Sequence, residues 1–273
     1  MKQRRKISAP VPTPGDPPLS ARSVVASTLL GVDPPVLPGR LLVKAAELFG
    51  IAEGTTRVAL SRLVAAGELE ADDGHYRLVG PLLLERQDRQ STSRRASHDR
   101  HWSGRWHLAV VKADRRDAAT RSALRDATRR LHLAELREGV WVRPDNLDPA
   151  RFPAARAVLD AQCRSFAGDL RSETEDDAAL AASLWDLPAW AATAETLRAD
   201  LAAVTGDLAT GDHAVLAPAW LLSAAVLRHL LADPRLPDAL LPPEWPGANL
   251  RADYDRYDRA FNHAWRQWFR AQG

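Results

Sequence analysis

Apolar residues recur at helical spacing in three successive segments near the start of the chain. Only Gly50 and Ile51 separate the second segment from the third, so the turn between them must be tight. Gly67 follows the third segment, where a glycine favours the end of a helix. The pattern therefore predicts three closely spaced helices, at residues 21–30, 39–49 and 52–66.

After Gly67 the helical period ends. The stretch from Leu69 to Leu78 predicts two short strands joined by a turn at Asp72-Asp73-Gly74-His75. The order helix, helix, tight turn, helix and hairpin is typical of a winged helix-turn-helix, in which one helix fits the DNA major groove. This order favours a nucleic-acid-binding protein over an enzyme. The tip of the hairpin is acidic, which argues against phosphate contacts there.

The third segment divides into two faces. Helical spacing places Thr56, Ala59, Leu60 and Leu63 on one inward stripe. Guanidinium groups donate paired hydrogen bonds to guanine, and hydroxyls bond bases or phosphates, so the outer residues suit DNA. An ordinary amphipathic helix with a solvated face is the alternative. The residues predicted to contact DNA are Thr55, Arg57, Val58, Ser61 and Arg62 of this helix, Arg40 and Lys44 of the preceding helix as phosphate contacts, and Arg77 of the hairpin.

The middle of the chain has a different period. Residues 106–111 form a strand pattern, 114–131 a helical pattern, and 136–142 a second strand pattern, with a third strand expected within 157–166. This spacing implies a small ferredoxin-like αβ unit. The remainder reads as helical, at 177–185, 188–204, 213–231 and 251–270.

The expected fold class is therefore α+β, with an N-terminal winged helix-turn-helix, a central ferredoxin-like domain and a helical C-terminal region. The segment 81–90 predicts a further helix that leads out of the winged helix. The proposed boundaries are a disordered, proline-rich tail at 1–19, a winged helix at 20–85, a connector at 86–105, an αβ domain at 106–170 and a helical domain at 171–273.

Charge and cysteine content agree with a cytoplasmic DNA-binding protein. Residues 1–107 hold 16 Lys and Arg against 11 Asp and Glu, whereas the remainder holds 21 against 24. The basic excess thus lies with the winged helix, as attraction to phosphates requires. Cys163 is the single cysteine, so no intramolecular disulfide forms and a cytosolic compartment is expected. The apolar run 214–227 is too short to span a bilayer, and no membrane partner is expected.

Motifs for common enzyme classes are missing from the sequence. There is no glycine-rich nucleotide loop, no Gly-x-Ser-x-Gly and no His-Glu-x-x-His. His98 and His101 have helical spacing but lack a third ligand, so no metal or cofactor is expected. The main alternative is a metal-dependent nuclease built on the αβ unit, with Asp114 and Asp117 as ligands, although acids at a helix start are commonly structural. A scaffold that binds no DNA is a third hypothesis.

Three segments together resemble the PaaX family of bacterial transcriptional repressors. The first is Phe49-Gly-Ile-Ala-Glu with Thr56-Arg57 and Ser61-Arg62-Leu63 up to Gly67. The second is Trp102-Ser-Gly-Arg-Trp106-His-Leu with the αβ unit that follows. The third and most specific runs from Asp233-Pro-Arg-Leu-Pro237 to Leu240-Leu-Pro-Pro-Glu-Trp-Pro-Gly247, followed by a helix with Tyr254 and Tyr257.

The resemblance implies a homodimeric repressor that binds double-stranded operator DNA near catabolic genes. It also implies release from DNA by a small-molecule effector such as an acyl-CoA, because the named member of the family responds to phenylacetyl-CoA. No catalytic activity is expected.

Overall fold

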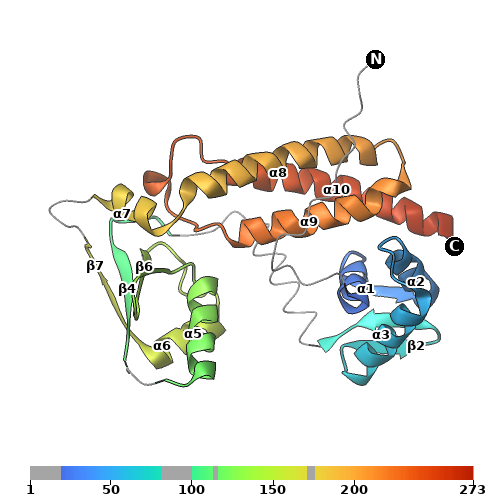
Figure 1. Cartoon of the computed structure of the whole chain (residues 1–273), viewed down its shortest axis with the longest axis horizontal. Helices are drawn as coiled ribbons and strands as arrows, with labels where there is room; N and C mark the ends of the chain where they lie inside the picture. Colours follow the sequence, from blue (N-terminus) through green and yellow to red (C-terminus); the bar gives the residue numbers. More distant parts are fainter. Residues whose placement is uncertain (1–19, 81–99, 113–115, 171–175, 273) are drawn as a thin grey trace, which may run out of the picture. The chain divides into compact units, whose positions relative to one another are not determined.

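The structure, a computed structural model, describes residues 20–80, 100–112, 116–170 and 176–272 of the 273-residue chain (Figure 1). The predicted tail, the helix at 81–90 and most of the connector lie outside these residues. The chain divides into two compact units. Unit 1 comprises residues 1–95, 196–228 and 249–273, and unit 2 comprises residues 96–195 and 229–248.

Unit 1 begins with three helices and a small sheet. The helices are α1 (Ala21–Leu30), α2 (Gly39–Glu47) and α3 (Glu53–Ala65), and the strands are β1 (Val36–Pro38), β2 (Leu69–Asp72) and β3 (His75–Leu78). The sheet is antiparallel with order β1-β3-β2. Leu29, Leu42, Leu60, Leu69 and Leu78 are almost fully buried between the helices and the sheet. The three helices and the hairpin lie where the sequence predicts them, whereas β1 was not predicted.

The hairpin turn positions the start of α2. Asp73 and Gly74 both have positive φ, at 41° and 71°, which matches the Asp-Gly preference of two-residue hairpin turns. Gly74 accepts a hydrogen bond of 2.9 Å from the Gly39 backbone N–H at the first residue of α2. A Cβ on Gly39 would lie 2.8 Å from the Tyr76 ring, so glycine allows this close approach.

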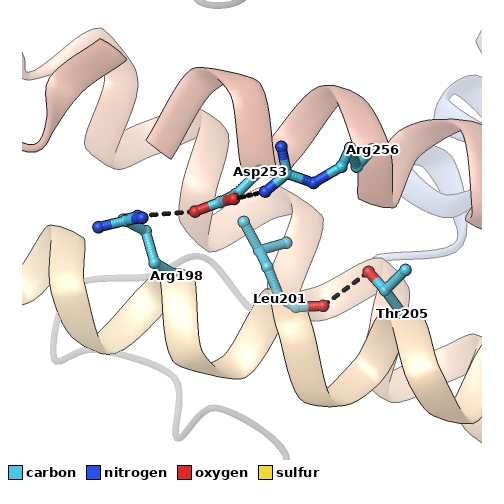
Figure 2. Close-up of polar contacts among 5 residues, drawn as sticks. All are labelled: Arg198, Leu201, Thr205, Asp253 and Arg256. Carbon is cyan, nitrogen blue, oxygen red and sulfur yellow. Dashed lines mark hydrogen bonds and ion pairs between the residues drawn. The ribbon is translucent and has the colours of Figure 1, made fainter. Parts of the chain in front are cut away.

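The second part of unit 1 is formed by residues 196–228 and 249–272. These residues belong to three long helices, α8 (Leu187–Leu208), α9 (Leu216–Leu231, preceded by a 3₁₀ turn at His213–Val215) and α10 (Gly247–Gln272). Asp253 of α10 accepts a hydrogen bond of 2.6 Å from Arg198 Nε on α8 and also pairs with Arg256 (Figure 2). On α8 itself, the Thr205 hydroxyl donates to the Leu201 carbonyl over 2.7 Å. An ion pair thus joins α8 to α10.

Aromatic residues of α10 fill the interior of this helical part. Tyr254, Tyr257, Trp265 and Trp268 are all at most 5% exposed. The Tyr257 hydroxyl donates to the Ala219 carbonyl on α9 over 2.6 Å, and Tyr254 shares a hydrogen bond with the Ser223 hydroxyl. These tryptophans and tyrosines therefore form a core, which is the commonest role of such residues.

Unit 2 contains a four-stranded antiparallel sheet with order β5-β6-β4-β7. Its chain order is β4 (Trp106–Val111), α5 (Ala118–Arg130), β5 (Ala134–Arg137), β6 (Val140–Pro144), α6 (Pro153–Gln162) and β7 (Cys163–Gly168). This βαββαβ connectivity is ferredoxin-like. One sheet face packs on α5 and α6 through Ala109, Leu124, Trp141 and Leu159. The chain is therefore of mixed α and β structure with a helical C-terminal region.

The other face of this sheet is covered at one end by α7 (Asp177–Leu184) and by the 3₁₀ turn η2 (Asp238–Leu240). Trp106 is fully buried there, and its indole N–H donates to Asp177 Oδ1 over 2.8 Å. The Trp102-Ser-Gly-Arg-Trp106 motif therefore serves core packing.

Two strand predictions in this unit are wrong in detail. The stretch 136–142 was read as one strand, but Gly139 has a φ of 76° and turns the chain between β5 and β6. The third strand expected within 157–166 is present as β7, but it begins only at Cys163, because α6 continues to Gln162. Pro153 at the first helical turn favours this helix. The sequence analysis assigned the apolar residues in the second half of α6 to the stretch expected to hold the strand.

The apolar run at 214–227, expected to be too short for a bilayer, lies within a longer helical segment. The run continues as one helical segment, His213–Leu231, that is long and apolar enough to cross a membrane by length and composition alone. It is the one such helix in the described residues, and 28% of its most apolar window is buried. A single helix of this kind is weak evidence for a membrane span, because helices in protein cores pass the same test.

Candidate nucleic-acid interface

The exposed face of α3 carries all five residues that the sequence predicts there. Thr56, Leu60 and Leu63 are at most 2% exposed and define the buried side. Ala59, predicted to face inward with them, is half-buried. At 100° per residue, the positions farthest from this side are Gly54, Val58, Ser61 and Ala65. Thr55, Arg57, Val58, Ser61 and Arg62 are all exposed.

The outermost stripe of α3 is narrow and nearly uncharged, with the two arginines on its flanks. Val58 is 50% exposed, so its methyl groups are accessible to a partner. Small side chains along the stripe let the backbone of α3 approach a partner closely. A valine methyl group can contact the thymine methyl group in the major groove. The stripe and its flanking guanidiniums therefore have the chemistry of a base-reading surface.

Local hydrogen bonds orient the polar side chains of this face. Arg57 forms an ion pair with Glu53 one turn earlier, with 2.6 Å between Nη2 and Oε1. The Ser61 hydroxyl donates to the Arg57 carbonyl over 3.1 Å. Both partners of the ion pair are more than half exposed, so the pair is weak and easily exchanged for another anion.

A groove of about 640 Å³ runs along one flank of α3, beside the first residues of α1. Thr55, Val58 and Arg62 line its α3 side, and Ser20 and Ala21 lie on the opposite side. Arg22 and Glu68, which also line the groove, form an ion pair of 2.5 Å. Three of the predicted DNA contacts thus border a single open groove rather than a flat surface.

The two predicted phosphate contacts of α2 are paired with another part of unit 1. Arg40 Nη1 donates to the Gln272 backbone carbonyl over 3.2 Å, and Lys44 Nζ donates to Gln272 Oε1 over 2.8 Å. Phe49 packs edge-on against Trp220 of α9, with ring centroids 5.0 Å apart. The sequence analysis missed these contacts because the partners are more than 170 positions apart in the chain.

Arg77 lies exposed on the central strand β3, opposite Val36 of β1 and Glu70 of β2. Its neighbour across the sheet is therefore acidic. Together with Asp72 and Asp73 at the turn, this makes the hairpin less basic than the face of α3.

The described residues do not support a metal site. Asp117, one of the two proposed nuclease ligands, caps α5 by accepting from the Thr120 backbone N–H over 2.6 Å. This hydrogen bond is the main cause of its lowered pKa. Within the described ranges, no group of three or more His, Cys, Asp or Glu residues could hold a metal ion. Asp114 and His98 lie outside those ranges.

Two half-buried histidines of unit 2 have lowered pKa values. Burial lowers the pKa of His132 well below its ordinary value of 6.5, and Arg143, Arg235 and Arg151 lower it further. Burial also lowers the pKa of His107, whose Nε2 is enclosed without a hydrogen-bond partner in this structure. Burial thus favours the neutral form of both imidazoles. Arg143 itself is 3% exposed and donates to the Leu131 carbonyl and to Asn146 Oδ1, so it stabilises the fold.

Comparison with known proteins assigns the chain to a family. Three family models match in succession: a PaaX-like protein model at residues 20–81, the PaaX protein central Cas2-like domain at residues 99–181, and the PaaX-like protein C-terminal domain at residues 185–271. No curated protein matches the chain.

A solved structure, that of the uncharacterized protein Rv0674 from Mycobacterium tuberculosis, is similar over almost the whole chain. It shares 40% sequence identity, covers 91% of this chain and 98% of its own, and superposes with a TM-score of 0.69. The three family models match in the same order as the three segments in which the sequence resembles the PaaX family. The chain belongs to the PaaX family.

Proposed function

We propose that the protein is a sequence-specific transcriptional repressor that reads operator DNA with α3. The family domains indicate a transcriptional regulator. The observation that carries the proposal further is the exposed face of α3, where a small, nearly uncharged stripe lies between Arg57 and Arg62. In this arrangement α1–α3 and the β2–β3 hairpin form a winged helix-turn-helix, and α3 enters the major groove.

The proposed contacts divide into two kinds. Thr55, Arg57, Ser61 and Arg62 bind base edges and adjacent phosphates, and Val58 contacts a thymine methyl group. Arg40, Lys44 and Arg77 bind phosphates and set the position of α3 on the duplex without reading sequence. Because Glu70 faces Arg77 across the sheet, Arg77 contributes the least of the three.

Two copies of the chain are proposed to bind one operator. A two-fold protein matches a palindromic site, and its two α3 helices would lie about one helical turn, roughly 34 Å, apart. De-repression is proposed to follow from an acyl-CoA that binds more tightly to the arrangement in which the two helices no longer match the half-site spacing. The site of action is the cytoplasm.

Fluorescence anisotropy on the DNA fragment upstream of the protein's own gene tests the proposal. The full chain is titrated with and without phenylacetyl-CoA, in the presence of unlabelled competitor DNA. Binding that resists competitor and is released by the thioester supports the repressor and its effector class. Binding that the thioester leaves unchanged supports the repressor and rejects this effector. Absence of salt-dependent affinity for any duplex, including oligonucleotides selected from a random pool, rejects DNA reading altogether.

A further inference from the structure

The last residue of α10 bonds the two cations of α2 that the proposed function gives to DNA phosphates. Lys44 reaches the side-chain oxygen of Gln272 over 2.8 Å, and Arg40 reaches its backbone oxygen over 3.2 Å. Arg40 and Lys44 lie one helical turn apart, so both ammonium and guanidinium groups point to the same side of α2. One residue therefore engages both phosphate-binding side chains at once.

Gln272 offers these cations acceptors that resemble a phosphate. The carbonyls of the last helical turn have no partner inside the helix and carry the partial negative charge of the helix end. The Gln272 carbonyl is one of these, and its amide oxygen adds a second acceptor beside it. A phosphate likewise presents several acceptor oxygens with negative charge, so the two ligands suit the same pair of cations.

The end of α10 is held near α2 by more than these two hydrogen bonds. Trp268 and Trp265, one and two turns before Gln272, are buried, and Tyr257 is bonded to α9. The contact of Phe49, just after α2, with Trp220 of α9 adds an aromatic pair between the same two parts of unit 1. The helix end is thus fixed in a position where it can act as an internal competitor.

We propose that Gln272 and DNA phosphates compete for Arg40 and Lys44, so that the docked end of α10 weakens DNA binding. The proposal rests on the proposed function for its second ligand, the phosphate. Release of the helix end frees two cations, strengthens binding and makes it more dependent on salt, because each additional phosphate contact adds about 0.9 to the slope of log affinity against log salt.

Two substitutions of opposite charge test the competition in the full chain. Gln272→Arg repels both cations and should tighten DNA binding about threefold to tenfold, with a steeper salt dependence, since the net contribution of a typical intramolecular hydrogen bond is of this order. Gln272→Glu should weaken binding by a similar factor, because it forms ion pairs with Lys44 and Arg40. Gln267→Arg and Gln267→Glu are the matched controls, because Gln267 is exposed on the same helix and bonds His263 instead.

The controls separate the contact from a general effect of charge. Changes at Gln272 that exceed the same changes at Gln267 at least threefold support the competition. Equal effects at the two positions show that only net charge matters and overturn it.

A second measurement needs no DNA. The chain has four lysines, and of these Lys44 and Lys112 lie in the described residues. Acetylation of the native protein, read by mass spectrometry, should label Lys44 about twofold to fivefold faster in Gln272→Arg than in the parent. Lys112, which bonds the Asp160 carbonyl, should not change and serves as the internal control.

The two measurements distinguish failure of the competition from failure of the proposed function. Unchanged labelling of Lys44 overturns the competition while the proposed function can still hold. Faster labelling of Lys44 in a protein that binds no DNA shows that the contact exists, and rejects both the proposed function and the competition that rests on it.

Discussion

Arg57 and Glu53 form an ion pair one turn apart on the exposed face of α3, with 2.6 Å between Arg57 Nη2 and Glu53 Oε1. An exposed pair at this spacing contributes only about 0.3–0.5 kcal/mol to stability. The pair therefore does little for the fold, and it orients the guanidinium along the helix while leaving it free to exchange partners. A guanine edge offers such a group two acceptors in a geometry that matches the guanidinium.

Arg57→Ala should relax sequence preference at one base pair of each half-site. The lost paired hydrogen bonds correspond to about 1–3 kcal/mol of discrimination. Competition binding against operators with single base changes measures this directly. Arg129→Ala is the control, because Arg129 has the same kind of exposed ion pair, with Asp126, in unit 2. An equal loss of affinity for all the operators would show that Arg57 contacts phosphate and reads no base.

Glu53→Ala should tighten binding to every sequence, because it removes a negative charge beside the DNA and frees Arg57. An increase of about twofold to fivefold in affinity is expected at low salt, and the gain should shrink as salt screens the charge. Glu138→Ala, which removes an exposed carboxylate from unit 2, should leave affinity nearly unchanged. If Glu53→Ala weakens binding and changes the preferred base instead, Glu53 itself accepts a hydrogen bond from cytosine.

Asp253→Asn should destabilise the helical part of unit 1. Asp253 is 13% exposed at its side chain and pairs with Arg198, which is 29% exposed, so the substitution removes one negative charge beside a partly enclosed guanidinium. A loss of about 1–2 kcal/mol is expected, since this pair is neither fully buried nor freely solvated. Urea denaturation followed by tryptophan fluorescence measures it. Asp126→Asn, at an exposed pair, should cost less than about 0.5 kcal/mol, and equal losses at both sites would contradict the role of the Asp253 pair.

Stability should fall as the pH drops from about 7.5 to 5.5. The folded-state pKa of His132 lies well below 6.5, with burial as the main cause, and burial also lowers the pKa values of His107 and His229. Below pH 6.5 the unfolded chain therefore binds more protons than the folded chain. The free energy of unfolding falls by at most about 1.4 kcal/mol per pH unit for each such histidine.

His132→Asn should make this pH dependence shallower. Asparagine tolerates the positive φ of 53° at this position, so the turn after α5 is retained. Urea midpoints at pH 7.5, 6.5 and 5.5 provide the comparison, with His213→Asn as a control at an exposed site. An unchanged slope would mean that His132 has the same pKa in the folded and unfolded chain.

The local pattern of the sequence predicts α1–α3 and the hairpin well because each is specified by nearby residues. Thr56, Leu60 and Leu63 repeat at helical spacing, and Asp73-Gly74 suits a tight turn. The αβ unit is predicted less well, because the signals of its nearby residues were misread. Gly139 inside an apolar stretch was read as part of a strand although it is a turn, and the stretch expected to hold the third strand begins with the last turns of α6.

Contacts between segments that are far apart in the sequence cannot be predicted from local patterns. Arg40 and Lys44 are basic and exposed, which is all the sequence shows, and nothing in it pairs them with Gln272. The predicted site residues of α3 are exposed as expected, but their DNA contacts stay a prediction.

The most direct test of the central claim is the DNA affinity of the parent chain and of a variant with Arg57, Ser61 and Arg62 all replaced by alanine, each measured at two salt concentrations on the same duplexes. If α3 reads DNA, the parent binds one operator tightly over competitor, and the variant keeps only weak, salt-sensitive binding that is equal for all sequences. If the variant retains the sequence preference of the parent, α3 is not the reading helix and the account is wrong.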